Sequence, residues 1–474
     1  MSNTPIYDML KKYVDSDFSR FHMPGHKGNY LNHIFSDILK YDITEINGAD
    51  SLYHADGVIL QSEQNIAEIY GAKRTLFSAG GATLAIQTML SLALSPHDKI
   101  IAGRNIHTSA VNVMALLDLT PIWVYPDGCS GENLPGRILA EDVEKAIIQN
   151  PDAKAVYITS PDYFGVVSNI SAISAVCHRY NIPLLVDNSH GAHLILTDKV
   201  EKVLSADEVS SICNRYNIEL QNHEIEIKKS MHPLLNGADM CVDSAHKTLP
   251  VLTGGAFLHI ANERYVENAK NRMSMFGSTS PSYLIMLSLD LCCEYLKTKA
   301  KEDFANLFAK TDEIYALAKE KGFSIPNGVL DKSKITLSAT NLGYNGNELA
   351  DYLRTYKIEV EYASLSHIVL MPSPFSKDED FIRLTSAIEQ IIPRTPIKIS
   401  GAEYLSPSVV CSIRDAVFGD SVELDVEFCE NRVSAEVKSP CPPGVPIIMP
   451  GERIEKGMSH ILKKYGIDKI KVLK

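Results

Sequence analysis

Lys247 follows a short apolar run by a few residues, in the segment 240–250 (MCVDSAHKTLP). The run 240–242 predicts a buried strand, and a lysine just past such a strand is partly removed from water. Desolvation lowers the pKa of an amine toward the neutral form that condenses with a carbonyl to give a Schiff base. Ser244 and His246 add donors that suit a phosphate. For a lone lysine, a solvated loop position is the commoner interpretation, so other segments must decide.

A glycine-containing loop, 78–83 (SAGGAT), directly precedes a predicted helix. Glycine lets the backbone approach a ligand closely, and a helix N-terminus presents free N–H groups with positive partial charge. A phosphate would be bound by the amides of Gly81 and Ala82 and by the amide and hydroxyl of Thr83. The alternative is an ordinary helix start with a flexible lead-in. The loop is not a Walker motif, because no Gly-Lys-Ser/Thr follows.

Two other segments offer a ring and further donors. In 104–109 (RNIHTS), His107 follows a predicted strand and could stack on a heteroaromatic cofactor, although a hydrogen-bonded structural histidine is the commoner case. In 275–283 (MFGSTSPSY), Ser278 and Thr279 precede a predicted helix and could donate to a phosphate. A simple capped helix start is the alternative for this loop.

A carboxylate ends another buried strand, in the segment 187–193 (DNSHGAH). Burying Asp187 is costly unless it is paired. A pyridinium N–H is a suitable partner, because the carboxylate would keep the ring protonated as an electron sink, and the small Ser189 would let the ring lie against the backbone. The rival interpretation is a metal site formed by Asp187, His190 and His193. Taken together, these segments favour a pyridoxal-phosphate (PLP) site.

The elements that must position these residues alternate between strands and helices over residues 58–300. Such alternation predicts an α/β fold with a mostly parallel sheet covered on both faces and a site beyond the carboxyl ends of its strands. The expected strands are 99–102, 122–125, 155–160, 183–187, 240–242 and 256–260. The expected helices are 1–20, 58–70, 83–94 and 173–180, followed by a helix-rich stretch at 283–322.

The chain of 474 residues is too long for one core, so we expect several units. Residues 1–57 form an N-terminal arm with a helix and a motif loop. Residues 58–300 form the PLP-binding major domain, with a polar, partly helical surface insertion at about 198–235. Residues 301–474 form a smaller α+β C-terminal region, which includes a family-specific segment at about 395–474.

The composition excludes several function classes. A formal net charge of −12 argues against nucleic acid or an anionic membrane as the main partner. The nine cysteines contain no C-x-x-C, which favours reduced thiols over a disulfide frame or a zinc site. No run approaches the ~18 apolar residues of a membrane span, and the start of the chain has no apolar signal core. We therefore expect a cytoplasmic enzyme without a metal.

The chain resembles fold-type-I PLP enzymes and, more narrowly, the Orn/Lys/Arg decarboxylase family in its short form without an N-terminal wing domain. The segment 244–250 (SAHKTLP) is the most specific match, and 187–193 is similar to the family's D-E-A-H-G-A-H block. Further similar blocks run along the chain: 21–28 (FHMPGHKG), 42–45 (DITE) with Asp50 and Gly57, 278–283 (STSPSY), 442–444 (PPG) and 450–452 (PGE).

The resemblance implies a role for each candidate residue. Lys247 would carry PLP as a Schiff base, Asp187 would pair with the pyridinium nitrogen, and His107 would stack on the ring. The phosphate would be bound by Ser244, His246 and Thr83, with Ser278 and Thr279 reaching over from a second subunit. The site would therefore lie at the interface of a homodimer, which could assemble further.

Three departures from the family pattern bear on the substrate. Ala82 stands where a hydroxyl residue is usual, and Asp162 stands where threonine is expected. The interval between Asp187 and Lys247 is lengthened by the insertion at 198–235.

The resulting hypothesis is decarboxylation of arginine, lysine or ornithine to agmatine, cadaverine or putrescine and CO2, a reaction of polyamine biosynthesis. The acid that protonates the α-carbon is left open among Lys247, His190 and His246. Recognition of a cationic substrate side chain needs acidic groups, and the candidates in motif blocks are Glu45, Asp50 and Asp162.

Two alternatives remain at this stage. One is another PLP enzyme, either an aldolase-like lyase or an aminotransferase, which would use an arginine for the substrate carboxylate, such as Arg383 or Arg394. The other is a non-catalytic PLP-binding protein, which the loss of a hydroxyl at Ala82 could suggest and the intact Asp187 and Lys247 pair argues against.

Overall fold

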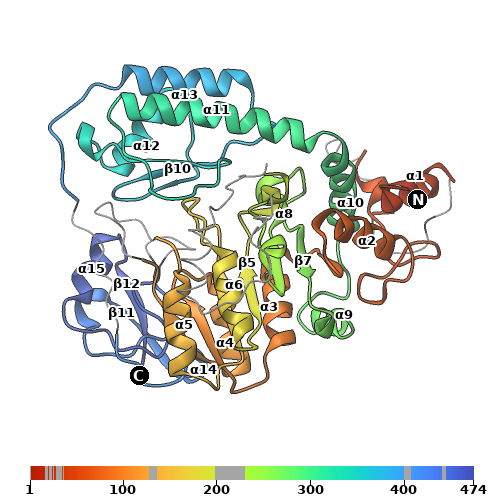
Figure 1. Cartoon of the computed structure of the whole chain (residues 1–474), viewed down its shortest axis with the longest axis horizontal. Coiled ribbons are helices and arrows are strands. Elements are labelled where there is room, and N and C mark those ends of the chain that lie inside the picture. The colour runs from red at the N-terminus through yellow and green to blue at the C-terminus, as the bar shows by residue number, and fades with distance from the viewer. Residues whose placement is uncertain are drawn as a thin grey trace, which may run out of the picture.

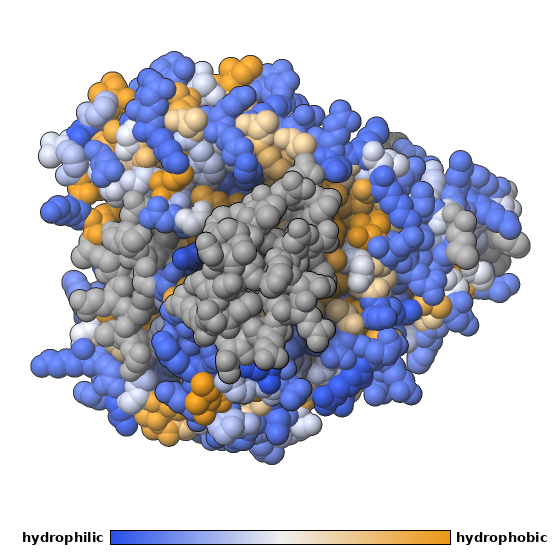
Figure 2. All heavy atoms as spheres, in the orientation of Figure 1, coloured by the Kyte–Doolittle hydropathy of each residue, from blue (hydrophilic) through white to orange (hydrophobic). Residues whose placement is uncertain are grey.

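The computed structural model describes the chain apart from residues 1, 17–19, 21–23, 25, 28–34, 36, 128–135, 198–229, 400–406 and 440–444. The expected helical insertion at 198–235 therefore lies almost wholly outside the described residues, as do parts of the motif blocks at 21–28 and 442–444. Among the described helices, none is both long and apolar enough to cross a membrane. Hydrophilic side chains predominate on the face seen in Figure 2, with apolar ones scattered between them.

A seven-stranded sheet forms the centre of the major domain (Figure 1). Its order is β1-β7-β6-β5-β4-β2-β3, and β2 to β6 are mutually parallel where they pair, while β7 runs antiparallel to both of its neighbours. The strands are β1 (Arg74–Ser78), β2 (Lys99–Gly103), β3 (Thr120–Val124), β4 (Ala155–Thr159), β5 (Leu184–Asp187), β6 (Met240–Asp243) and β7 (Ala256–Ile260).

Alternate residues of these strands enter two different cores, one on each face of the sheet. Ile101, Val156 and Val186 pack on one face, whereas Ile100 and Leu185 pack on the other. The first face is covered by α2 (Val58–Tyr70), α5 (Ala140–Gln149), α6 (Ile170–Arg179) and α10 (Tyr283–Thr298). The second is covered by α3 (Gly81–Ala93), α4 (Thr108–Leu117) and α9 (Ala269–Ser274). Burial on both faces explains why the strands read as continuous apolar runs.

The predicted α/β architecture is confirmed, with the expected strands and helices displaced by at most a few residues at their ends. The N-terminal helix α1 (Pro5–Asp15) is shorter than the expected 1–20. Strand β1 was not predicted; it lies at one edge of the sheet and pairs antiparallel with β7 from Arg74↔Ile260 to Ser78↔Ala256. Its five residues carry no polar and apolar alternation that would have marked them as an edge strand.

Two smaller units follow the major domain. The long helix α11 (Ala300–Glu320) leads into a three-stranded sheet of β8 (Ile335–Leu337), β10 (Ile368–Leu370) and β9 (Tyr362–Ala363), covered by α12 (Gly346–Thr355) and α13 (Asp378–Gln390). The last unit pairs β11 (Ser421–Asp425) with β12 (Lys469–Leu473) and adds α14 (Ile413–Phe418) and α15 (Met458–Lys464). Figure 1 shows these two units at the top and at the lower left, beside the major sheet.

A buried ion pair joins the last unit to the end of β2. The Arg104 guanidinium donates to both carboxylate oxygens of Glu452 at 2.6 and 2.8 Å, and it lies 5.0 Å from the centre of the Trp123 ring. Arg104 is fully buried and Glu452 is 2% exposed. This bidentate contact fixes the segment that begins at Arg104 and carries His107, which gives the 450–452 motif a structural role.

We expect Glu452→Ala to lower the free energy of unfolding by about 3–5 kcal/mol, because it leaves the Arg104 charge buried without its partner. The matched control is Glu427→Ala, which removes an exposed ion pair with Lys463 in the same unit and should lower the free energy of unfolding far less. Urea unfolding measures both. Equal losses in the two variants would contradict a special role for the buried pair.

Candidate active site

The candidate residues follow parallel strands and meet at the carboxyl end of the sheet. His107 follows β2, Asp187 ends β5, and Lys247 lies on the single-turn helix α8 (Ala245–Thr248), which directly follows β6. Strands β5 and β6 are direct neighbours, with Asp187 opposite Val242. The turns that leave these two strands therefore lie side by side, which brings the Asp187 and Lys247 segments together.

Lys247 contacts His190 in this arrangement. The Lys247 Nζ lies 3.0 Å from His190 Nε2. Burial lowers the pKa of Lys247, while the carboxylates of Asp187 and Glu361 act in the opposite direction. Desolvation therefore moves this lysine toward the neutral amine that a Schiff base requires.

His190 is a neutral, buried imidazole. Its pKa lies well below the ordinary value, first because of burial and then because of the nearby Lys334 and Lys247 charges. Its Nδ1 is buried and has no hydrogen-bond partner in the described part of the chain. An orphaned ring nitrogen beside an amine can accept or donate a proton once a ligand or water reaches it.

Asp187 is a buried carboxylate held by neutral donors. It is 2% exposed and accepts hydrogen bonds from the Tyr157 hydroxyl at 3.2 Å and from the Ser189 amide and hydroxyl at 3.1 and 2.5 Å. Neutral donors orient the carboxylate without adding a charge of their own. Its surroundings therefore suit a cationic N–H such as a pyridinium nitrogen.

His107 is the N-cap residue of helix α4, and this capping contact fixes its side chain. Its Nδ1 accepts the Ser109 N–H at 3.1 Å and lies 2.8 Å from the Ser109 hydroxyl. Burial lowers the pKa of His107, with Asp187 raising it and Lys247 lowering it further. The ring is therefore neutral, fixed in orientation, and close to both of these charged residues.

The glycine loop presents an open helix N-terminus, with one correction to the expected phosphate contacts. A side chain added at Gly81 would meet nothing within 4 Å, and this residue has a φ of +70°, a conformation that favours glycine. The Gly81 amide, however, already donates to the Gly254 carbonyl at 2.8 Å. The amides of Ala82 and Thr83 lie in the first turn of α3, where a backbone N–H has no acceptor within the helix. They can therefore donate to an anion.

The remaining phosphate candidates fall into two groups. Ser244 Oγ lies 3.3 Å from His246 Nδ1, which is also 3.2 Å from the Gly255 carbonyl oxygen. Ser278 and Thr279 are exposed in the single chain, in the loop before α10, where the Ser278 hydroxyl accepts the Ser280 amide. The first pair therefore belongs to the Lys247 turn, whereas the second is presented outward.

These residues fit PLP. The open glycine turn at a helix N-terminus suits a phosphate, the Asp187 carboxylate suits a pyridinium nitrogen, and the desolvated Lys247 suits an aldehyde. The rival metal site does not form, because His193 turns away to bind Asp331 at 2.7 Å and stacks on Phe304.

The acidic groups expected to recognise substrate require correction. Asp50 accepts five backbone N–H groups around the start of α2 (Ser51, Asp56, Gly57, Ile59 and Leu60), so its carboxylate is a structural cap. Asp162 is 3% exposed and accepts the amides of Phe164 and Val166 within its own loop. Glu45 is exposed and accepts the neighbouring Thr44 hydroxyl.

Sequence reasoning missed one acidic residue beside the site. Glu361 comes from the small three-stranded unit and accepts the Tyr163 hydroxyl at 3.0 Å, across a separation of 198 residues. The Tyr163 ring stands edge-on to His190, with 5.3 Å between ring centres. The buried Lys334 donates to the carbonyls of Asp162 and Tyr163 at 3.0 and 2.8 Å. The contacts of Glu361 and Lys334 leave no signal in local sequence, because they join different units.

Burial raises the pKa of Asp162 to about 7. Because the folded pKa is raised, the proton stabilises the fold at low pH, and this stabilisation is lost as the pH rises from about 4 through 7. An amide in place of this carboxyl group cannot titrate. We therefore expect Asp162→Asn to gain on the order of 1–3 kcal/mol relative to the native protein between about pH 5 and about pH 8. Urea unfolding at the two pH values measures this, and a pH-independent difference would contradict it.

Comparison with solved structures identifies the class of the fold. The chain superimposes on the constitutive lysine decarboxylase of Escherichia coli with a TM-score of 0.76, at 17% identity, over 99% of this chain and 82% of the other. It superimposes on a serine palmitoyltransferase of Sphingomonas wittichii with a TM-score of 0.54, at 14% identity, over 82% of this chain and 83% of the other. The fold is that of fold-type-I PLP-dependent enzymes.

Sequence comparison gives the family. The model for the major domain of Orn/Lys/Arg decarboxylases matches residues 4–319, and the model for their C-terminal domain matches residues 410–465. The chain therefore belongs to the Orn/Lys/Arg decarboxylase family. It is similar to an arginine decarboxylase of Bacillus subtilis, at 29% identity over 97% of this chain and 93% of that protein. The protein is a PLP-dependent decarboxylase, and PLP is its cofactor.

Proposed function

We propose that the protein decarboxylates a basic amino acid, with arginine as the first candidate among arginine, lysine and ornithine. The observation that carries this proposal is the Glu361 carboxylate beside the Lys247 and His190 pair, where it raises the pKa of Lys247. Arginine is favoured because the Bacillus subtilis relative is named for it. A lysine decarboxylase of Escherichia coli is more distant, at 20% identity.

Glu361 is suited to bind the distal cation of such a substrate. Its backbone N–H donates to the Val369 carbonyl at 2.9 Å, which fixes its place at the edge of the small sheet. One carboxylate oxygen accepts the Tyr163 hydroxyl, and the side chain remains exposed. A guanidinium or ammonium can therefore reach it, and a charge-assisted hydrogen bond would orient the substrate.

In this mechanism PLP, when bound, supplies the electron sink for the electron pair left by departing CO2. Lys247 would hold the cofactor through its desolvated amine. Asp187, oriented by Tyr157 and Ser189, would pair with the ring nitrogen. Ala82 and Thr83 would hold the phosphate through their amides.

Proton return to the α-carbon is assigned to Lys247 or its neighbour His190. Their 3.0 Å contact lets one supply a proton and the other replace it. His246 is a weaker candidate, because its Nδ1 faces Ser244 and the Gly255 carbonyl. The candidates for the acid that protonates the α-carbon are therefore Lys247 and His190.

The alternative PLP reactions receive less support. An aminotransferase would need an arginine for the substrate carboxylate, but Arg383 lies 3.6 Å from Asp380 and Arg394 lies 3.7 Å from Glu348, on half-exposed parts of the small unit. The match to the Orn/Lys/Arg decarboxylase family argues against a non-catalytic PLP-binding protein.

The proposal includes a homodimer in the cytoplasm. The exposed Ser278 and Thr279 would contribute to the phosphate site of the second subunit, as the family resemblance implies. The free cysteines Cys177, Cys241, Cys292, Cys293, Cys411 and Cys429 fit a reducing compartment.

We expect Glu361→Gln to raise KM for the basic substrate about 10-fold to 100-fold with a smaller change in kcat, because it removes the charge opposite the distal cation. Glu359→Gln is the matched control, since Glu359 is exposed and pairs with Arg354 on the surface. Steady-state kinetics on both variants decide the matter. An unchanged KM in Glu361→Gln would remove this residue from substrate binding.

The reaction itself is tested by amine products in mass spectrometry. The PLP-loaded protein receives an equal mixture of arginine, lysine, ornithine and several neutral and acidic amino acids. One dominant product among agmatine, cadaverine and putrescine supports the proposal and identifies the substrate. A keto acid, or an amine from a neutral or acidic amino acid, would contradict it.

A further inference from the structure

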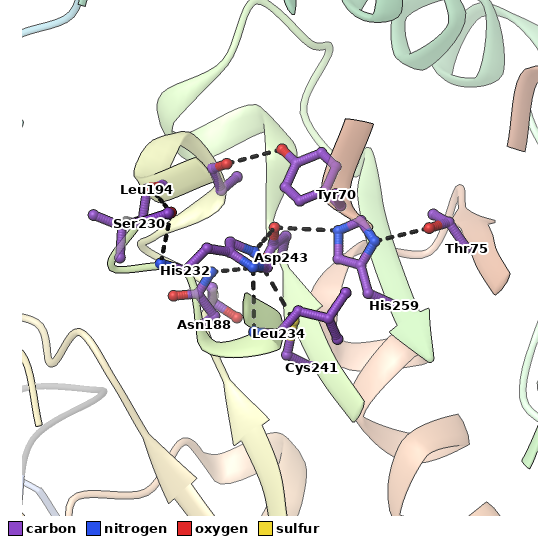
Figure 3. Close-up of polar contacts among 12 residues, drawn as sticks. Tyr70, Thr75, Asn188, Leu194, Ser230, His232, Leu234, Cys241, Asp243 and His259 are labelled. Atoms are coloured by element: carbon purple, nitrogen blue, oxygen red, sulfur yellow. Dashed lines mark hydrogen bonds and ion pairs between the residues drawn. The ribbon is translucent and has the colours of Figure 1, made fainter. Parts of the chain in front are cut away.

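A second cluster of ionisable side chains joins β6 and β7 to the turn at His232 (Figure 3). His232 Nε2 and His259 Nε2 lie 2.9 and 3.2 Å from the same oxygen of Asp243. All three residues are fully buried. Their types and spacing are those of a metal site, and the cluster takes no part in the mechanism above.

The hydrogen-bond directions favour a proton-linked network over a metal. The Leu234 N–H can only donate, and it points at His232 Nδ1, so this nitrogen acts as an acceptor and the ring proton lies on Nε2. That proton faces Asp243, whose pKa is held far below its ordinary value by its two histidine partners against the effect of burial. A metal ligand would need an unprotonated Nε2. His259 also faces Asp243 through Nε2, and its Nδ1 lies 2.8 Å from the Thr75 hydroxyl, which can donate or accept.

The other oxygen of Asp243 connects the cluster to the Asp187 segment. It accepts the side-chain N–H of Asn188 at 2.7 Å, and the Asn188 backbone N–H donates to the Val242 carbonyl at 2.9 Å. Asn188 directly follows Asp187. Asp243 therefore ties the end of β5 to the end of β6 through a side chain as well as through the sheet.

Asn188 also shapes the turn that presents His190. Its carbonyl accepts the Gly191 N–H at 2.7 Å, which closes the turn around His190. A side chain at Gly191 would come within 2.1 Å of the Asn188 amide oxygen, so this position needs glycine. On the other strand, Asp243 precedes Ser244 and the turn that carries Lys247.

We propose that Asp243 is a positioning residue, which through Asn188 fixes the His190 turn against the Lys247 turn. His232 and His259 hold the Asp243 carboxylate ionised and in place, and Asn188 transmits its position to the residues on either side. This inference rests on the proposed roles of Lys247 and His190. Displacements of about 1 Å in a reacting pair reduce rates by about 100-fold, so a link of this kind affects kcat.

The opposite end of β6 offers a matched control. There Asp239 accepts the Leu184 N–H at 2.8 Å, a side-chain N–H of Asn262 at 2.8 Å and His178 Nε2 at 3.0 Å. The same kinds of residues thus form a similar network on the same strand, at the end away from the site. If both networks only stabilised the fold, removing either one would change stability, and kcat and PLP binding would respond alike in the two cases.

The experiment compares Asn188→Ala with Asn262→Ala in the PLP-loaded protein. We expect Asn188→Ala to lower kcat about 10-fold to 100-fold with little change in KM, and to weaken PLP binding at least about 5-fold by absorbance titration. Asn262→Ala should leave kcat and PLP affinity within about 2-fold of the native values. It should lower the thermal midpoint by about as much as Asn188→Ala does. Equal effects of the two variants on kcat and PLP binding would overturn the proposal.

A reciprocal exchange keeps the test decisive if a single variant is unstable. Asn188→Asp alone places two carboxylates against each other. Adding Asp243→Asn restores a hydrogen bond between the two positions, with residue 243 now the donor and residue 188 the acceptor. The double variant should recover PLP affinity at least about 5-fold over the single, and a double variant no better than the single would overturn the link. The PLP titration needs no turnover, so it decides even if no basic amino acid is decarboxylated. If metal analysis of the purified protein found one zinc or other transition metal ion per chain, it would overturn the proposed hydrogen-bond network.

Discussion

The site depends on the parallel pairing of β5 with β6. Because Asp187 lies opposite Val242 in this register, both strands deliver their following turns to one edge of the sheet. The pairing brings His190 within 3.0 Å of Lys247, with His190 buried and Lys247 partly buried. Desolvation then lowers the pKa of each, so that neither holds its charge as it would in water. One backbone register thus supplies both the geometry and the electrostatics of the pair.

The smaller units complete what this edge begins. Lys334 reaches across to the carbonyls of Asp162 and Tyr163, and Glu361 binds the Tyr163 hydroxyl. These contacts bring an acidic group beside a site otherwise built by the major domain. At the other side, Glu452 holds Arg104 at the start of the His107 segment. Each appended unit therefore acts on the site through polar contacts with the segments that follow the strands of the sheet.

Much of the fold and part of the site could be predicted from the sequence. Apolar runs marked the buried strands, and the residues after them fell at one edge because parallel strands share a direction. Local signals failed where distant segments meet. Glu361 and the two partners of Asp243 are set by contacts across the fold, and Asp50 looked like a substrate ligand although it caps a helix. The Gly81 amide was lost to Gly254 for the same reason.

The central claim is that Lys247 is the amine that carries PLP. Borohydride reduction of the PLP-loaded protein, followed by proteolysis and mass spectrometry of the peptides, tests it directly. The account predicts a pyridoxyl phosphate adduct on the peptide that contains Lys247, at close to one per chain. An adduct on another lysine, such as the buried Lys334, with Lys247 unmodified would contradict it.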